Sequence, residues 1–146
     1  KKIDPKNLNL TYFSKEHSDH AMIALNMFKN NILFGHGVKM FRFRCSEEKY
    51  YINPRACTTH PHGILFVFLS ETGLLGFSFL LISYFYLIRN FFRSTSNLDK
   101  TILLSIFIYL FPFVPLGYFF NNYFSIILYT LIGLHLGTKK AYRVDK

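Results

Sequence analysis

The feature that most constrains the fold of this chain is a nearly uniform apolar run from Gly63 to Ile88. Apart from tyrosines, five polar residues interrupt it: Ser70, Glu71, Thr72, Ser78 and Ser83. About 20 apolar residues cross the hydrocarbon core of a bilayer, so this run is long enough to span a membrane. We therefore expect a membrane helix near residues 63–89.

Two further apolar runs predict helices near residues 101–120 and 123–138. The first contains Pro112 and Pro115, which kink or break a helix, although membrane helices tolerate prolines where neighbours satisfy the freed carbonyls. A length of 146 residues is one domain's worth. The expected fold is an all-α integral membrane protein, with an external loop over residues 1–62 and a membrane region of about three helices over residues 63–146.

Basic residues predict the orientation. Seven of the 17 lysines and arginines flank the apolar runs: Arg89, Arg93, Lys100, Lys139, Lys140, Arg143 and Lys146. By the positive-inside rule, the 89–100 loop and the tail from Lys139 are cytoplasmic, so residues 1–62 and Asn121-Asn122 lie outside. Ten basic residues also occur in residues 1–62, but long external segments follow the rule less strictly. The net charge of +9 is not gathered on one predicted face, so we expect no nucleic-acid partner.

The external segment predicts a helix of its own. Ser18 is a plausible N-cap with Asp19 in the first turn. Apolar residues then recur at helical spacing at Ala21, Ala24 and Phe28. We expect an amphipathic helix near residues 18–31 that packs against the protein or the membrane surface.

Cys45 and Cys57 are the only cysteines, and both lie in the predicted external loop. In an oxidising periplasm a pair so placed favours a disulfide, which would stabilise the loop by roughly 3 kcal/mol in the chain-entropy model. The alternative is two buried free thiols. His60 and His62 flank Pro61 and no further pair completes a ligand set, so we expect no zinc site.

His62 is the leading candidate for chemistry. It lies where the predicted membrane helix meets water, and the Glu71 carboxylate follows nine positions later. Ionisable groups at such places are costly in lipid and are functional candidates by default, and histidine titrates near neutral pH. The alternative is a histidine that caps backbone groups or faces solvent. Gly73 and Gly76 indicate close approach of a neighbouring helix.

Several short motifs follow one another along this chain: Phe34-Gly35-His36-Gly37, Phe41-Arg42, Cys45, Cys57, Thr59-His60-Pro61-His62, Leu69-Ser70-Glu71-Thr72-Gly73-Leu74-Leu75-Gly76 and Pro115-Leu116-Gly117-Tyr118-Phe119-Phe120-Asn121-Asn122. Together they resemble the O-antigen ligase and polymerase superfamily, which has an F-G-x-G turn, an H-P-H-N block and an E-x-G-x-x-G helix start in the same order. The resemblance runs from about Ser18 to Gly137, and Gly63 stands where the family usually has Asn, Ser or Gln.

The resemblance implies the C-terminal portion of a polytopic, GT-C-like glycosyltransferase of the bacterial inner membrane, with its active loop in the periplasm. The donor would be a glycan on undecaprenyl diphosphate, and the acceptor a sugar hydroxyl on lipid A-core, as in lipopolysaccharide biosynthesis, or on a second lipid-linked glycan. Such enzymes need no metal or nucleotide sugar. The earlier membrane helices of the family are missing, so the fragment alone is expected to be inactive.

The resemblance also implies roles for individual residues. His62 is the expected base or acceptor-orienting residue. Arg42 matches the family's F-R position and is the first candidate for binding the diphosphate, with Arg44 and Arg55 next, because arginine forks suit phosphate oxygens. The alternative for each arginine is a solvated loop charge. His60 and Glu71 are expected to support the site, Glu71 by pairing with an arginine or with His62, or else by capping or packing.

Two other functions remain open from the sequence. An O-antigen polymerase would use the same donor, and nothing in these residues separates it from a ligase. A non-catalytic membrane segment, such as a transporter fragment with a phenylalanine-rich bundle, predicts instead that substitutions at His62 are harmless.

Overall fold

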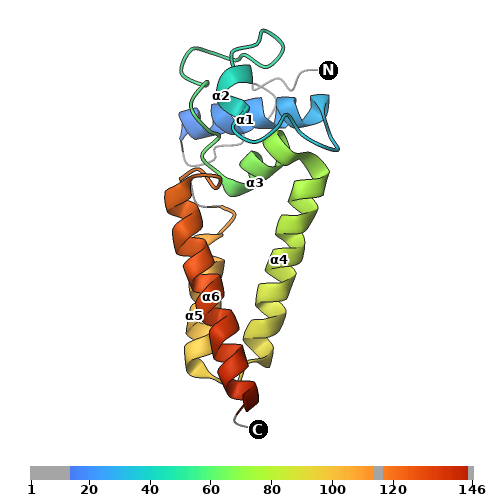
Figure 1. Ribbon diagram of the computed structural model, residues 1–146. Coiled ribbons are helices and arrows are strands. Elements are labelled where there is room, and N and C mark those ends of the chain that lie inside the picture. Colours follow the sequence, from blue (N-terminus) through green and yellow to red (C-terminus); the bar gives the residue numbers. More distant parts are fainter. Residues whose placement is uncertain (1–13, 114–116, 145–146) are drawn as a thin grey trace.

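The computed structural model describes residues 14–113 and 117–144, with side chains up to residue 140, and within these ranges the regular structure is helical with no strand (Figure 1). In chain order the elements are α1 (Lys15–Asn30), α2 (Phe41–Arg44), α3 (Ile64–Val67), the π-helix η2 (Phe68–Thr72), α4 (Gly73–Arg93), α5 (Asn97–Tyr109) and α6 (Asn122–Val144).

Helices α5 and α6 run side by side, whereas α4 meets them at the α4–α5 turn and diverges from them toward the other end, where α1 and α2 lie (Figure 1). The connection between α5 and α6 is at this same end, beside α3, whereas the α4–α5 turn and the C-terminus are at the opposite end. The topology predicted from the basic flanks puts residues 1–62 and Asn121-Asn122 on one side of the membrane. That topology requires the α5–α6 connection to lie at the same end of the helices as α1.

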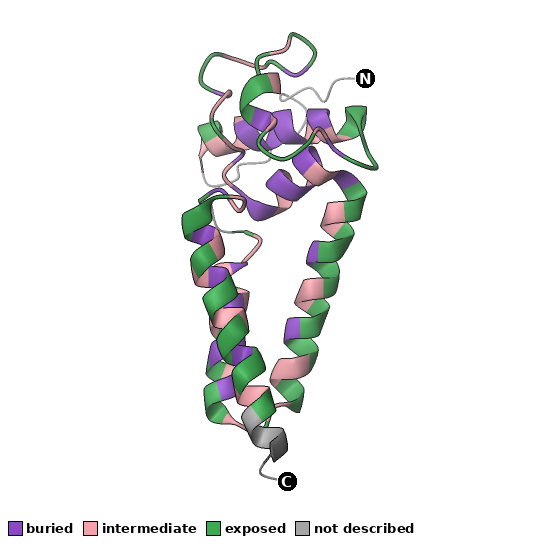
Figure 2. Cartoon of the chain, in the orientation of Figure 1, coloured by how far each residue is buried: buried purple, intermediate pink, exposed green. Residues whose placement is uncertain are grey.

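One helix in the described part of the chain, Ile64–Arg93, is long and apolar enough to cross a membrane. Its outward side is largely exposed (Figure 2), with side chains such as Phe79, Ile82 and Phe85 at least 65% exposed. Apolar surface of this extent is typical of contact with lipid or with further protein. The comparable helices expected near 101–120 and 123–138 do not meet the same test.

The predicted start of the first helix is wrong by several residues. The N-cap of α1 is Ser14, whose hydroxyl accepts from the His17 backbone N–H at 3.3 Å. Ser18 lies inside the helix, and its hydroxyl donates to the Ser14 carbonyl at 2.9 Å. The apolar stripe begins after the first turn, so periodicity alone set the start too late.

The helix predicted near 101–120 differs at both ends. It begins at Asn97, because the Ser96 hydroxyl accepts from the Asp99 N–H at 3.4 Å and caps it. It ends at Tyr109, because Pro112 has no N–H and disfavours helical geometry in the residue before it. The last helix continues past the predicted residue 138 to Val144, since lysines are favourable near a helix C-terminus and hydropathy does not mark its end. Pro115 lies outside the described residues.

Two apolar clusters form the core. One joins the long helices and contains Phe68, Leu80 and Leu103. The other joins α1 to the external loop through Ile23, Met27, Phe41, Cys45, Tyr50 and Ala56. In this second cluster Cys45 and Cys57 form a disulfide with a Cα–Cα distance of 5.3 Å. The bond holds the two ends of the segment 46–56 together.

A buried polar contact fixes the opposite end of the bundle. Asp99 on α5 accepts from His135 Nδ1 at 2.6 Å and from the Thr138 hydroxyl at 2.9 Å, both on α6. The Tyr86 hydroxyl on α4 lies 3.4 Å from His135 Nε2. Asp99 and His135 are both buried, so each supplies the partner that the other needs.

Candidate functional site

The site forms where the helix Ile64–Arg93 is interrupted. At Gly73 the backbone adopts φ 64° and ψ −159°, so the π-helix ends and α4 starts anew. Such a break leaves N–H and C=O groups without helical partners. The segment of residues 32–37, which we call the docking loop, supplies them.

Four backbone hydrogen bonds join the docking loop to the break. Carbonyls of Ile32 and Leu33 accept from the first N–H groups of α4, those of Leu74 and Leu75, at 2.8 and 3.3 Å. In the other direction, the N–H groups of His36 and Gly37 donate at 3.0 and 2.8 Å to the carbonyls of Ser70 and Glu71. The loop therefore caps both sides of the interruption.

Two glycines permit this close contact. A Cβ at Gly73 would lie 2.5 Å from the Leu33 carbonyl oxygen and 2.6 Å from the Gly35 nitrogen. A Cβ at Gly35 would lie 2.6 Å from the Glu71 carbonyl oxygen and the Thr72 nitrogen. Gly73 is thus a close-approach site, but for the docking loop and not for a neighbouring helix as expected. At Gly76 a Cβ would collide with the Thr72 side chain one turn earlier in the same chain segment.

The Glu71 side chain extends the same contact. It is buried, and its carboxylate accepts from the backbone N–H groups of Lys39 at 2.9 Å and Phe41 at 3.2 Å, and from the Tyr118 hydroxyl. Lys39 holds a positive φ of 65°, and its N–H also lies 2.7 Å from the Tyr118 oxygen. The expected pairing of Glu71 with an arginine or with His62 is therefore wrong: backbone N–H groups and a phenol satisfy it.

Four histidine rings lie close together next to the Glu71–Tyr118 contact. His62 lies in the centre, with ring-centroid distances of 4.2 Å to His60, 5.2 Å to His20 and 5.5 Å to His17. The His60 ring is 5.6 Å from the Tyr118 ring, which links the histidines to the Glu71 contact. We call these four side chains the histidine cluster.

The backbone and the surroundings of His62 are both unusual. Its φ of 47° is in the left-handed region, which costs a residue with a side chain roughly 1–2 kcal/mol; strain of this kind concentrates at functional sites. The ring is half-buried. Burial, then the neighbouring His20 and His17, lower the pKa of His62 from its ordinary 6.5, so the imidazole is neutral and can accept a proton near pH 7.

The three arginines predicted for the diphosphate lie in different surroundings. Arg42 on α2 is exposed, and its charge acts on both Glu71 and Tyr118. Arg44 is engaged with Glu47 at 3.9 Å. Arg55 has an exposed side chain, while its backbone carbonyl lies 3.3 Å from His20 Nε2. Of the three, Arg42 is thus the arginine whose charge acts on the Glu71–Tyr118 contact.

Sequence reasoning missed three members of this site. His17 and His20 are spaced i, i+3, so they share a face of α1, and this spacing in a chain with only six histidines could have indicated them. Tyr118 belongs to one of the motifs that carry the resemblance, but the sequence predicted no role for it. Its pairing with Glu71 brings together residues 47 positions apart, which no local pattern indicates.

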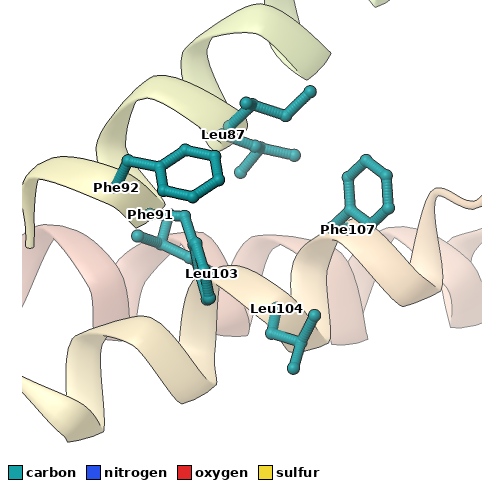
Figure 3. Close-up of a pocket in the computed structure, with 7 residues that line it drawn as sticks. Leu87, Phe91, Phe92, Leu103, Leu104 and Phe107 are labelled. Atoms are coloured by element: carbon teal, nitrogen blue, oxygen red, sulfur yellow. The ribbon is translucent and has the colours of Figure 1, made fainter.

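Two mainly apolar cavities lie along the helices. The smaller, about 200 Å³ between α4 and α5, is lined by leucine, isoleucine and phenylalanine side chains (Figure 3). The larger, a groove of about 430 Å³ among α4, α5 and α6, extends from Phe68 and Phe119 near the histidine cluster to His135 at the far end.

Among the described residues, no group of three or more histidine, cysteine, aspartate or glutamate side chains is arranged to hold a metal ion. No family model, curated protein or solved structure matches this chain.

Proposed function

We propose that this chain carries the external catalytic site of a polytopic membrane glycosyltransferase similar to O-antigen ligases. It would act on the periplasmic face of the inner membrane and move a glycan from undecaprenyl diphosphate to a sugar hydroxyl of lipid A-core. A polymerase that uses the same donor differs only in the acceptor.

The observation that carries this proposal is that the motifs behind the resemblance contact one another. The docking loop contains the F-G-H-G turn, and it caps the helix break made by the S-E-T-G segment. Glu71 of that segment binds the backbone of Lys39 and Phe41 and the hydroxyl of Tyr118. Motifs scattered over more than 80 positions thus form one unit, which is what a shared active-site scaffold requires.

The reaction needs a base for the acceptor. In the proposed step the acceptor hydroxyl oxygen bonds to the anomeric carbon of the donor sugar, and the bond from that carbon to the phosphate oxygen breaks. The hydroxyl proton passes to the neutral His62 ring, and undecaprenyl diphosphate departs with the electron pair. A positioned base of this kind contributes on the order of 10²–10⁴-fold to the rate.

The diphosphate needs positive charge and the lipid tail needs an apolar path. Arg42 supplies a fork of N–H donors that matches phosphate oxygens. The apolar groove among α4, α5 and α6 has Phe119 at its upper end, next in sequence to Tyr118. A polyprenyl tail in that groove would keep the diphosphate near the membrane boundary, on the side of the histidine cluster.

The test is transfer by the full-length protein reconstituted with a lipid-linked glycan, with lipid A-core or a second lipid-linked glycan as acceptor. We expect His62→Ala to lower transfer by roughly 10²–10⁴-fold. Arg42→Lys should also impair transfer, because an ammonium cannot reproduce the bidentate fork.

Arg89→Lys is the matched control, since Arg89 is exposed near the opposite end of the bundle, and it should leave transfer unchanged. Wild-type rates for His62→Ala at equal protein level would end the catalytic assignment. The acceptor that is consumed separates ligase from polymerase.

A further inference from the structure

We infer that His20 is a positioning residue for His62, the acceptor that holds one ring N–H of His62 so that its other ring nitrogen is presented as a base. This inference rests on the proposed function of His62. His20 lies on α1, outside the motifs that carry the resemblance.

The hydrogen bond at one nitrogen of His20 determines the state of the other. His20 Nε2 lies 3.3 Å from the Arg55 backbone carbonyl, and a carbonyl can only accept. Nε2 therefore carries the proton, and in the neutral ring Nδ1 is an acceptor.

That acceptor is buried and unused. His20 is only 4% exposed, and Nδ1 has no hydrogen-bond partner among the described residues. Leaving such a group unsatisfied costs about 1–3 kcal/mol, so the site favours any donor that can reach it.

The nearest ring able to supply a donor is His62. Two imidazoles joined by an N–H···N bond of about 2.9 Å have ring centroids roughly 5 Å apart, and the His20 and His62 centroids are 5.2 Å apart with an interplanar angle of 32°. A rotation of the His62 ring at this separation forms the bond. His17 is farther from His20, at 6.0 Å, and its Nδ1 is already 2.8 Å from the Ser14 hydroxyl.

Several titratable and charged groups surround the His20–His62 pair. Groups that face the pair are Glu16, His17 and Asp19 on α1, Arg55 and His60 in the loop, and Tyr118 through His60. Asp19 accepts from the Asn53 amide at 2.7 Å. Burial is the main cause that lowers the pKa of His62, and His20 is the next. Without His20 the His62 N–H loses its acceptor, so that contact no longer favours one tautomer of His62 over the other.

The experiment compares two substitutions at His20 in the full-length protein in lipid nanodiscs. His20→Phe keeps a ring but removes the acceptor, while His20→Asn keeps an acceptor oxygen near the place of Nδ1. If the larger ring is not accommodated, His20→Leu takes its place. His36→Gln is the control for the ring spectra alone, because His36 likewise has Nε2 near a backbone carbonyl, at 2.9 Å from Met27, but its ring lies edge-on to Tyr50 outside the histidine cluster.

The first readout is NMR of the histidine rings, which reports the tautomer and the titration of His62 without any need for activity. We expect one dominant His62 tautomer in the wild type, a mixture in His20→Phe, and recovery of the dominant tautomer in His20→Asn. The second readout is transfer against pH. His20→Phe should lower turnover by about 10–100-fold, part of what a positioned base contributes.

Different results would contradict the proposed function and the His20–His62 pairing. If the wild type transfers no glycan, the proposed function fails, and the NMR comparison still decides the His20–His62 pairing. An unchanged His62 tautomer in His20→Phe would overturn the pairing, as would wild-type turnover by that variant in a protein that His62→Ala inactivates.

Discussion

Replacement of Gly73 by alanine tests the contact between the docking loop and the broken helix. At φ 64° and ψ −159°, Gly73 occupies a region that is essentially restricted to glycine, and holding another residue there costs about 1–3 kcal/mol. The new Cβ would also lie 2.5 Å from the Leu33 carbonyl oxygen. Both obstacles are backbone, so the chain itself has to move.

The size of the effect follows from what that movement breaks. A shift of the docking loop lengthens the bonds from Leu74 to the Ile32 carbonyl and from His36 to the Ser70 carbonyl, and each buried group left unpaired costs about 1–3 kcal/mol. Strain and one lost bond together give a decrease in the free energy of unfolding of about 2–6 kcal/mol.

The assay is a reversible SDS titration of the protein in mixed micelles, followed by circular dichroism. Gly133→Ala is the control: a Cβ there meets nothing within 4 Å, and alanine in a helix interior should raise stability by about 0.5–1 kcal/mol. A change of less than about 0.5 kcal/mol in the free energy of unfolding of Gly73→Ala is well below the cost of backbone strain alone. Such a result would refute the assignment of Gly73 to this contact.

Two further predictions concern the external loop and the orientation. Mass spectrometry under non-reducing conditions should recover linked Cys45 and Cys57 peptides, and reduction should lower stability by roughly 3 kcal/mol in the chain-entropy model; two freely alkylated thiols without reductant would contradict the bond. Reporter fusions after Asn97 and at the C-terminus should report cytoplasm and a fusion after Glu48 should report periplasm, and a reversed pattern would remove His62 from the compartment of the donor.

The sequence was most informative where structure depends on long apolar patterns. The apolar run from Gly63 predicted the helix Ile64–Arg93, because spanning length and hydropathy accumulate over many residues. Helix ends were less predictable, since single contacts decide them: the Ser14 hydroxyl starts α1, and Pro112 follows the end of α5.

The candidate site was predicted only in part. His62 and Glu71 were found because they are titratable groups at the edge of an apolar run. The partners of Glu71 could not be found, because they are backbone N–H groups and a tyrosine brought together by the tertiary fold. The same holds for Asp99 and His135, whose contact depends on the register of α5 against α6.

The capped break also has a consequence for biogenesis. The N–H and C=O groups exposed at Gly73 find their partners in residues 32–37, and these residues leave the ribosome before residues 70–75 do. If the proposed orientation holds, the docking loop is already outside the membrane when the interrupted helix arrives there. Vectorial synthesis thus delivers the cap ahead of the helix that needs it, and a rearranged gene that encoded residues 32–37 after α4 would send the break into lipid with its backbone unpaired.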